Sequence, residues 1–219
     1  MKAVLFDFNG TLFDDTRFHM RAWQKYMREK FGISLTLDEV RQKFIGPNNA
    51  TIFHSFFGDR FSETELHAFS REKEEEYRAA ARAEGALHLM EGAPELFDLL
   101  TERGVPFALA TASEMDNVRF YLEDLGLKRW FTLDRIVYEE GKLASKPDPA
   151  FYIEAARRIG LSPEDCTIVE DSPTGIQAAV NARAGRIVAI DRSAPREWLE
   201  GHPQIDAIIH DFRGFERFI

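Results

Sequence analysis

The sequence predicts an α/β protein in which a doubly wound parallel sheet, a Rossmann-like core, carries an inserted helical cap. Five short runs of β-branched and aromatic residues are continuously apolar, as expected for strands buried on both faces. Helical segments alternate with these runs from residue 90 onward, which indicates parallel strands joined by crossover helices. Residues 15–86 show helical periodicity without a convincing strand, so we assign them to the cap and residues 1–14 and 87–219 to the core.

The core elements follow from this alternation. Strands are expected at residues 2–8, 107–111, 167–171, 186–191 and 207–211. One helix is expected at 94–103, before Gly104, and another at 149–159, with Asp148 as its N-cap and Gly160 beyond its end. Between them, helical spacing is kept by Met115, Val118, Leu122 and Leu125.

The cap is expected to consist of amphipathic helices. One helix face is formed by Phe18, Ala22, Trp23, Tyr26, Met27 and Phe31. Two pairs have the spacing of capping boxes, in which a hydroxyl and a carboxylate satisfy backbone N–H groups at a helix start: Thr36 with Glu39, and Ser62 with Glu65. The charge run at 71–76 is interpreted as a solvated helix face rather than a ligand surface.

Composition limits the classes of partner. The net charge of -9 and the lack of a Lys/Arg block argue against binding to DNA or RNA polymers. Cys166 is the sole cysteine and lies in an apolar run, which predicts a core residue and a reducing compartment, the cytoplasm. No stretch has the apolar length of a signal peptide or a membrane span, so neither secretion nor a membrane partner is expected.

Polar residues follow three of the predicted strands. In an open parallel sheet, ligands bind beyond the carboxyl ends of the strands. Asp7 opens the segment 7–11, Thr111 opens 111–113, and Glu170 and Asp171 close a third strand, while Lys146 lies in a loop before a helix. Each of these features alone has an ordinary structural explanation, such as a helix cap or a surface turn. Their joint occurrence at one edge predicts a site.

These residues together supply what phosphoryl transfer requires. Asp7 offers a carboxylate able to form an aspartyl-phosphate, and Asp171 offers a second hard oxygen ligand for magnesium. Lys146 offers positive charge for the phosphate. The Thr111 hydroxyl and the backbone N–H groups of the turn 9–11, where Gly10 permits close approach, offer hydrogen-bond donors for phosphoryl oxygens.

The chain resembles the haloacid dehalogenase superfamily, in its β-phosphoglucomutase and phosphoglycolate phosphatase-like branch. Four motifs carry the resemblance in order: Asp7-Phe-Asn-Gly-Thr-Leu12, Ala110-Thr-Ala-Ser113, Lys146-Pro-Asp-Pro149 and residues 169–179. It implies that Asp7 is the nucleophile and that the insertion is a substrate-selecting lid. It also implies phosphate contacts from Gly10, Thr11, Thr111, Ala112 and Lys146, and Mg²⁺ held by Asp7, Asp171 and the backbone carbonyl of Asn9, with Glu170 as a ligand or a neighbour of one.

Residue 9 departs from this family pattern. Phosphatases and mutases of this kind carry aspartate there as a general acid and base, whereas this chain has Asn9, whose amide cannot relay a proton. A general acid and base contributes about 10²–10⁴ in rate. We therefore expect that Asp7 still captures the phosphoryl group but that turnover is slow. The loss of rate should be smallest for acyl and aryl phosphates. A second possibility is that ageing converts residue 9 to aspartate and restores activity, because an Asn-Gly pair is prone to deamidation.

Three functions stay open on the sequence. The first is a magnesium-dependent phosphatase of small phosphorylated metabolites, expected to be a monomer because a lid must open and close. The second is a phosphohexomutase, disfavoured because residues 44–51 contain no arginine; dehalogenase and phosphonate-cleaving activities are disfavoured by residue 9 and by a segment 46–49 without lysine. The third is a catalytically impaired protein that binds a phosphorylated ligand. Loops typical of P-loop, dinucleotide and serine-hydrolase sites are absent from the sequence.

Overall fold

The computed structural model describes residues 2–44, 49–85 and 87–219. The chain forms two compact units. The core unit comprises Met1–Asp14 and His88–Ile219, and the cap unit comprises Asp15–Leu87. Within the core unit, the chain leaves and returns at neighbouring positions, because the backbone N–H of Met90 donates to the Leu12 carbonyl at 2.7 Å.

The core unit is built on a parallel sheet of six strands in the order β3-β2-β1-β4-β5-β6. The strands are β1 (Ala3–Phe6), β2 (Phe107–Glu114), β3 (Ile136–Glu139), β4 (Cys166–Glu170), β5 (Arg186–Ile190) and β6 (Ala207–Ile209). The predicted doubly wound α/β fold is therefore confirmed. The sequence prediction missed β3, which has only four residues and whose second half is only partly buried.

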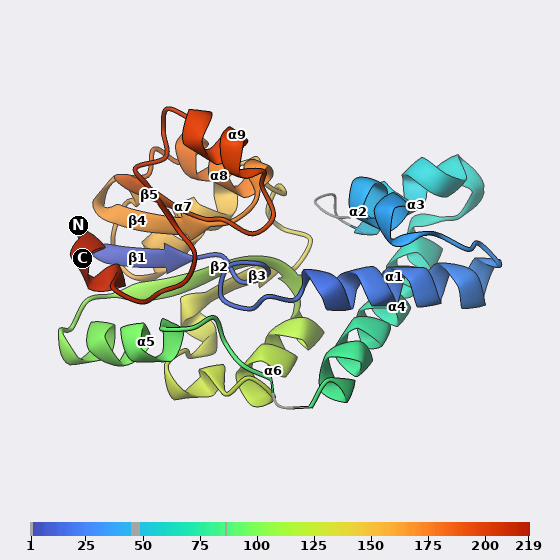
Figure 1. Cartoon of the computed structure of the whole chain (residues 1–219), viewed down its shortest axis with the longest axis horizontal. Coiled ribbons are helices and arrows are strands. Elements are labelled where there is room, and N and C mark those ends of the chain that lie inside the picture. Colours follow the sequence, from blue (N-terminus) through green and yellow to red (C-terminus); the bar gives the residue numbers. More distant parts are fainter. Residues whose placement is uncertain (1, 45–48, 86) are drawn as a thin grey trace. The chain divides into compact units, whose positions relative to one another are not determined.

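Helices cover both faces of this sheet (Figure 1), which is why β1 is buried along its whole length. Phe6 packs edge-on against Phe97 of α5 (Ala93–Glu102), on the same side as α6 (Met115–Glu123). Leu5 points to the opposite side, into a cluster with residues of α7 (Ala150–Arg158), α8 (Pro173–Asn181) and α9 (Arg196–Gly201). The helices expected at 94–103 and 149–159 are thus found within one residue of their predicted bounds.

In its described residues, the cap unit contains four α-helices: α1 (Thr16–Phe31), α2 (Leu37–Phe44), α3 (Asn49–Phe57) and α4 (Glu63–Ala83). Its core is rich in aromatic rings, including Trp23, Phe44 and Phe53. Both predicted capping boxes are present: the Thr36 hydroxyl accepts from the Glu39 N–H, and Ser62 and Glu65 cap α4 in the same way. Within the described residues, no helix has both the length and the apolar character needed to cross a membrane.

The charge run at 71–76 is not wholly solvated, and that interpretation was wrong for two residues. Lys73 is 1% exposed and Glu74 is also buried. The Lys73 ammonium lies 2.7 Å from Glu74 Oε1 and 2.8 Å from His19 Nδ1, and it sits over the Trp23 ring. The reason is helical periodicity, since the buried residues of α4 recur every three or four positions: Leu66, Phe69, Ser70, Lys73, Glu74, Tyr77, Arg78 and Ala81.

The absence of arginine from residues 44–51 and of lysine from residues 46–49 was used to disfavour two activities. Residues 45–48 lie outside the described residues. The role expected of this segment therefore stays a prediction.

Candidate active site

The order of the strands brings the predicted polar residues together. β1 lies between β2 and β4, so the residues that follow or end these three strands share one edge of the sheet. Asp7, Glu170 and Asp171 each place a carboxylate oxygen within 4.8 Å of the other two, and all three residues are buried. Thr111, in β2, is fully buried, whereas the neighbouring Ala112 is exposed.

Lys146 joins two of these carboxylates. Its ammonium lies 2.6 Å from Asp7 Oδ1 and 2.6 Å from Glu170 Oε1, and it also donates to the Ala110 carbonyl and to the Tyr152 hydroxyl. Burial by itself would lower the pKa of Lys146, but the negative charges of Asp7 and Glu170 outweigh burial and raise the pKa above its usual value. Lys146 therefore stays charged.

Glu170 is saturated with hydrogen bonds. Its Oε1 accepts from Lys146 and from Tyr152, and its Oε2 accepts from the backbone N–H groups of Asp171 and Ser172 and from the Ser172 hydroxyl. Burial opposes ionisation, yet Lys146 and these donors lower the pKa of Glu170 below its usual value. A Cβ at Gly175 would lie 1.7 Å from Glu170 Oε1, so only glycine fits there. Glu170 thus fixes Lys146 and the start of α8.

Asp171 is oriented by two hydroxyls. Thr11 donates to its Oδ1 at 3.2 Å, and Ser193, from the loop after β5, donates to its Oδ2. Burial, together with the negative charges of Glu170 and Asp7, raises the pKa of Asp171 well above its usual value. The Gly10 backbone closes in on this carboxylate, since a Cβ there would meet Asp171 Oδ2 at 2.2 Å. Asp171 is thus held in one orientation.

The carboxylate cluster has the character of a cation site. Three buried carboxylates face one lysine, so the ionised cluster carries excess negative charge that a bound cation would neutralise. Oxygen ligands from carboxylates suit hard divalent cations. The residues of this cluster that could hold such an ion are Asp7, Asp171 and Glu170. Glu170 already accepts hydrogen bonds at both of its oxygens, from Lys146 and from the backbone N–H groups of Asp171 and Ser172 among others.

The backbone N–H groups of the turn after Asp7 are bonded within the turn itself. The N–H of Gly10 donates to the Phe13 carbonyl at 2.8 Å, and the N–H of Thr11 donates to the Phe8 carbonyl at 3.2 Å. These two N–H groups, which the sequence analysis assigned to phosphoryl oxygens, are therefore bonded within the turn. Their role as phosphate donors stays a prediction.

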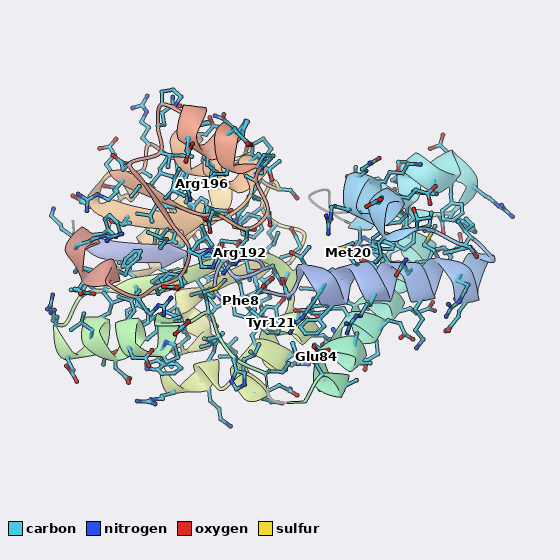
Figure 2. The ribbon with its side chains drawn as sticks, in the orientation of Figure 1. Phe8, Met20, Glu84, Tyr121, Arg192 and Arg196 are labelled. Atoms are coloured by element: carbon cyan, nitrogen blue, oxygen red, sulfur yellow. The ribbon has the colours of Figure 1, made fainter. Side chains whose placement is uncertain are left out.

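Asn9 belongs to this turn, and its side chain lies in a network of hydroxyls. Ser113 donates to its Oδ1 at 2.9 Å, and Thr111 makes a longer contact of 3.4 Å with the same atom. The Asn9 amide nitrogen donates to the Tyr121 hydroxyl at 3.0 Å. Tyr121 belongs to α6 and its ring stacks on that of Phe8; both residues are labelled in Figure 2.

Sequence reasoning did not identify Tyr121, Tyr152 or Ser193 as parts of this site. Tyr152 had a weak signal, because it follows Lys146 by six residues at the start of a predicted helix. No sequence pattern pointed to Tyr121 or Ser193, because both reach the site through packing between segments distant in sequence.

Comparisons with known proteins identify the family of this chain. A sequence model of the family described as haloacid dehalogenase-like hydrolase matches residues 1–183. Hexitol phosphatase A of Escherichia coli is 29% identical over 95% of this chain and 90% of its own length. A β-phosphoglucomutase of Bacillus subtilis is 28% identical over 83% of this chain and 80% of its own length.

A solved structure adds a match at the level of the fold. The family IA haloacid dehalogenase-like hydrolase, variant 3, of Entamoeba histolytica superposes with a TM-score of 0.89 at 30% identity, covering 97% of this chain and 94% of that one. The chain therefore belongs to the haloacid dehalogenase-like hydrolase family, in the branch that contains β-phosphoglucomutases and sugar-phosphate phosphatases.

Proposed function

We propose that this protein is a magnesium-dependent phosphatase of small phosphorylated metabolites that forms an aspartyl-phosphate on Asp7. The observation that carries this proposal is the position of Asp7, a buried carboxylate 2.6 Å from the Lys146 ammonium and grouped with Asp171 at the carboxyl edge of the sheet. A carboxylate next to a fixed cation can attack phosphorus while the cation attracts the phosphoryl oxygens.

In this proposal, Mg²⁺ is held by Asp7, Asp171 and the backbone carbonyl of Asn9. The bound ion would reduce the repulsion between the Asp7 carboxylate and the incoming phosphate. Thr11 and Ser193 keep the Asp171 carboxylate in place, which limits the reorganisation needed when the ion binds. Glu170 acts indirectly, by fixing Lys146.

The phosphoryl oxygens are assigned to Lys146, the Thr111 hydroxyl and the backbone beside Ala112. Lys146 is charged and its side chain is only 9% exposed, so its attraction for phosphate is little screened by water. Gly10 and Thr11 contribute through the shape of the turn and through the orientation of Asp171.

Asn9 sets the rate in this proposal. Protonation of the leaving oxygen and activation of water both need a proton-transferring group at residue 9, and an amide has none. Phosphoryl transfer to Asp7 persists, while poor leaving groups depart slowly and the aspartyl-phosphate hydrolyses slowly. Acyl and aryl phosphates are expected to react faster because their leaving groups need less help from an acid.

The substrate class follows from the relatives, which are named as a hexitol phosphatase and a β-phosphoglucomutase. We assign small phosphorylated sugars or sugar alcohols to this chain, and we assign substrate selection to the cap unit, acting as the lid of a monomer.

The test measures free phosphate from hexose phosphates and acyl phosphates with Mg²⁺, for the wild type, Asn9→Asp and Asp7→Asn. Asn9→Asp is expected to raise kcat on hexose phosphates by about 10²–10⁴ and to change acyl phosphate hydrolysis less. Asp7→Asn is expected to abolish both. Equal hydrolysis of hexose phosphates by the wild type and Asn9→Asp would refute the assigned role of residue 9.

A phosphohexomutase is the second candidate, favoured by the similarity to the β-phosphoglucomutase of Bacillus subtilis. The same incubations discriminate it when isomerised sugar and phosphate-labelled Asp7 are measured together with free phosphate. Isomer without free phosphate indicates the mutase. Binding of sugar phosphate without any product indicates the third candidate, a protein that binds a phosphorylated ligand.

A further inference from the structure

The Asn9 side chain is part of a closed ring of hydrogen bonds. The ring joins the Asn9 amide, the Tyr121 hydroxyl and the Ser113 hydroxyl, with distances of 3.0 Å from Asn9 Nδ2 to Tyr121, 2.8 Å between the hydroxyls, and 2.9 Å from Ser113 to Asn9 Oδ1. Each hydroxyl has one proton to donate. Since Ser113 donates to Asn9, Tyr121 must donate to Ser113, and the three bonds run in one direction around the ring.

The ring lies in a well-packed part of the core unit. Tyr121 is fully buried, and its aromatic ring stacks on Phe8 with a centroid separation of 3.7 Å. Asn9 and Ser113 are partly buried, so the ring is only in part exposed to water. Hydrogen bonds in such a network support one another and hold their members in one rotamer. The Asn9 amide is therefore pulled toward Ser113 and Tyr121.

This restraint bears on the chemistry of the Asn9–Gly10 pair. In deamidation, the Gly10 backbone nitrogen loses its proton to solvent base and attacks Asn9 Cγ, so that a C–N bond forms. The Cγ–Nδ2 bond then breaks, and ammonia leaves with a proton from water. Addition of a water molecule opens the cyclic imide to aspartate or isoaspartate. Glycine at residue 10 favours the attack because it has no side chain to hinder it.

Both partners of that attack are engaged in the folded chain. The Gly10 N–H donates to the Phe13 carbonyl at 2.8 Å, and the Asn9 amide is bonded at both of its ends. Attack requires the amide to leave the ring and the N–H to leave its acceptor. The fold thus opposes a modification that the isolated dipeptide would undergo readily.

We propose that Ser113 and Tyr121 lock the Asn9 side chain and thereby protect the Asn9–Gly10 bond from deamidation in the native state. The lock determines whether residue 9 remains an amide. If the proposed function holds, loss of the lock would admit aspartate at residue 9 and with it the missing proton-transferring group, so the lock also maintains slow turnover.

The experiment follows the mass of the peptide 3–17 during incubation at mildly alkaline pH. It compares folded wild type, wild type unfolded in urea, Tyr121→Phe, Ser113→Ala and the control Tyr138→Phe, which removes a hydroxyl bonded to exposed Glu140. Circular dichroism and urea unfolding establish that each variant is folded, and Ser113→Ala carries the test if Tyr121→Phe does not fold.

Folded wild type and Tyr138→Phe are expected to deamidate at least about tenfold more slowly than the urea-unfolded chain. Folded Tyr121→Phe and Ser113→Ala are expected to deamidate about tenfold faster than folded wild type, the factor that corresponds to one lost hydrogen bond. Wild-type rates in both folded variants would overturn the proposal, as would equal rates for folded and unfolded wild type. Because the readout is mass, the result is independent of whether the protein is a phosphatase.

Discussion

Gly10 is a residue at which backbone conformation and site geometry act together. Its φ of +76° lies in the left-handed region, and a Cβ there would meet the Asp171 carboxylate. A side chain at residue 10 would therefore strain the backbone and displace a proposed metal ligand at once.

Gly10→Ala is expected to lower the free energy of unfolding by roughly 1–2 kcal/mol from backbone strain alone, and also to weaken Mg²⁺ binding measured by calorimetry. Gly32→Ala is the matched control, because Gly32 has a φ of +69° with nothing within 4 Å of an added Cβ. It should show the stability loss without the loss of Mg²⁺ affinity. Unchanged Mg²⁺ affinity in Gly10→Ala would contradict the placement of the ion beside Asp171.

At the level of elements, α4 shows how a charged sequence can form a packed surface. Glu74 accepts from Lys73 and from Asn49, and both of these bonds are inside the cap unit. Burial opposes its ionisation, but Lys73, His19 and Asn49 outweigh burial and lower the pKa of Glu74 to about 2. Because the pKa of Glu74 is lower in the folded state than in the unfolded state, the ionised carboxylate stabilises the fold.

Glu74→Gln is expected to lower the free energy of unfolding at neutral pH by an amount on the order of 3 kcal/mol. The contribution is fully present above the unfolded-state pKa of 4.5 and is lost as pH falls toward about 2, so the gap between wild type and variant should narrow over that range. Urea unfolding between neutral and acidic pH measures it. Glu75→Gln, at an exposed position on the same helix, should show little change; a pH-independent gap for Glu74→Gln would count against the ion pair.

The elements also show what sequence can and cannot reveal. β1, with four buried residues between polar neighbours, has a strong pattern, whereas β3 has four residues of which two are partly exposed, and its pattern is too short to separate from a loop. Asp7 and Asp171 were predictable because strand ends converge in a parallel sheet. Tyr121 and Ser193 were not, because their contacts depend on how α6 and the loop after β5 pack.

At the scale of the whole molecule, the carboxylate cluster would couple the proposed metal binding to the stability of the fold. Folding gathers three carboxylates around a single lysine, in a chain whose net charge is already -9. An ion that binds only the folded state shifts the folding equilibrium toward that state.

Mg²⁺ at about 100 times its Kd is expected to stabilise the wild type by about 2.7 kcal/mol, measured as a rise in Tm that chelation with EDTA reverses. Asp171→Asn should lose this increment, while the control Asp148→Asn, at an exposed residue outside the cluster, should keep it. A Tm unaffected by Mg²⁺ in the wild type would exclude the proposed ion site.

The hydrogen bond between Met90 N and Leu12 O has a consequence for how this chain can be redesigned. The bond holds the end of the first core segment, at Leu12, beside the start of the second core segment, at Met90. The cap unit is inserted between these two points. A graft at these points would splice into a preformed junction, so the insert can be treated as an exchangeable cassette. Transplanting the equivalent insert of a relative between Asp14 and His88 should yield a folded chimera, and phosphate release from a substrate panel would then report the specificity that travels with the insert.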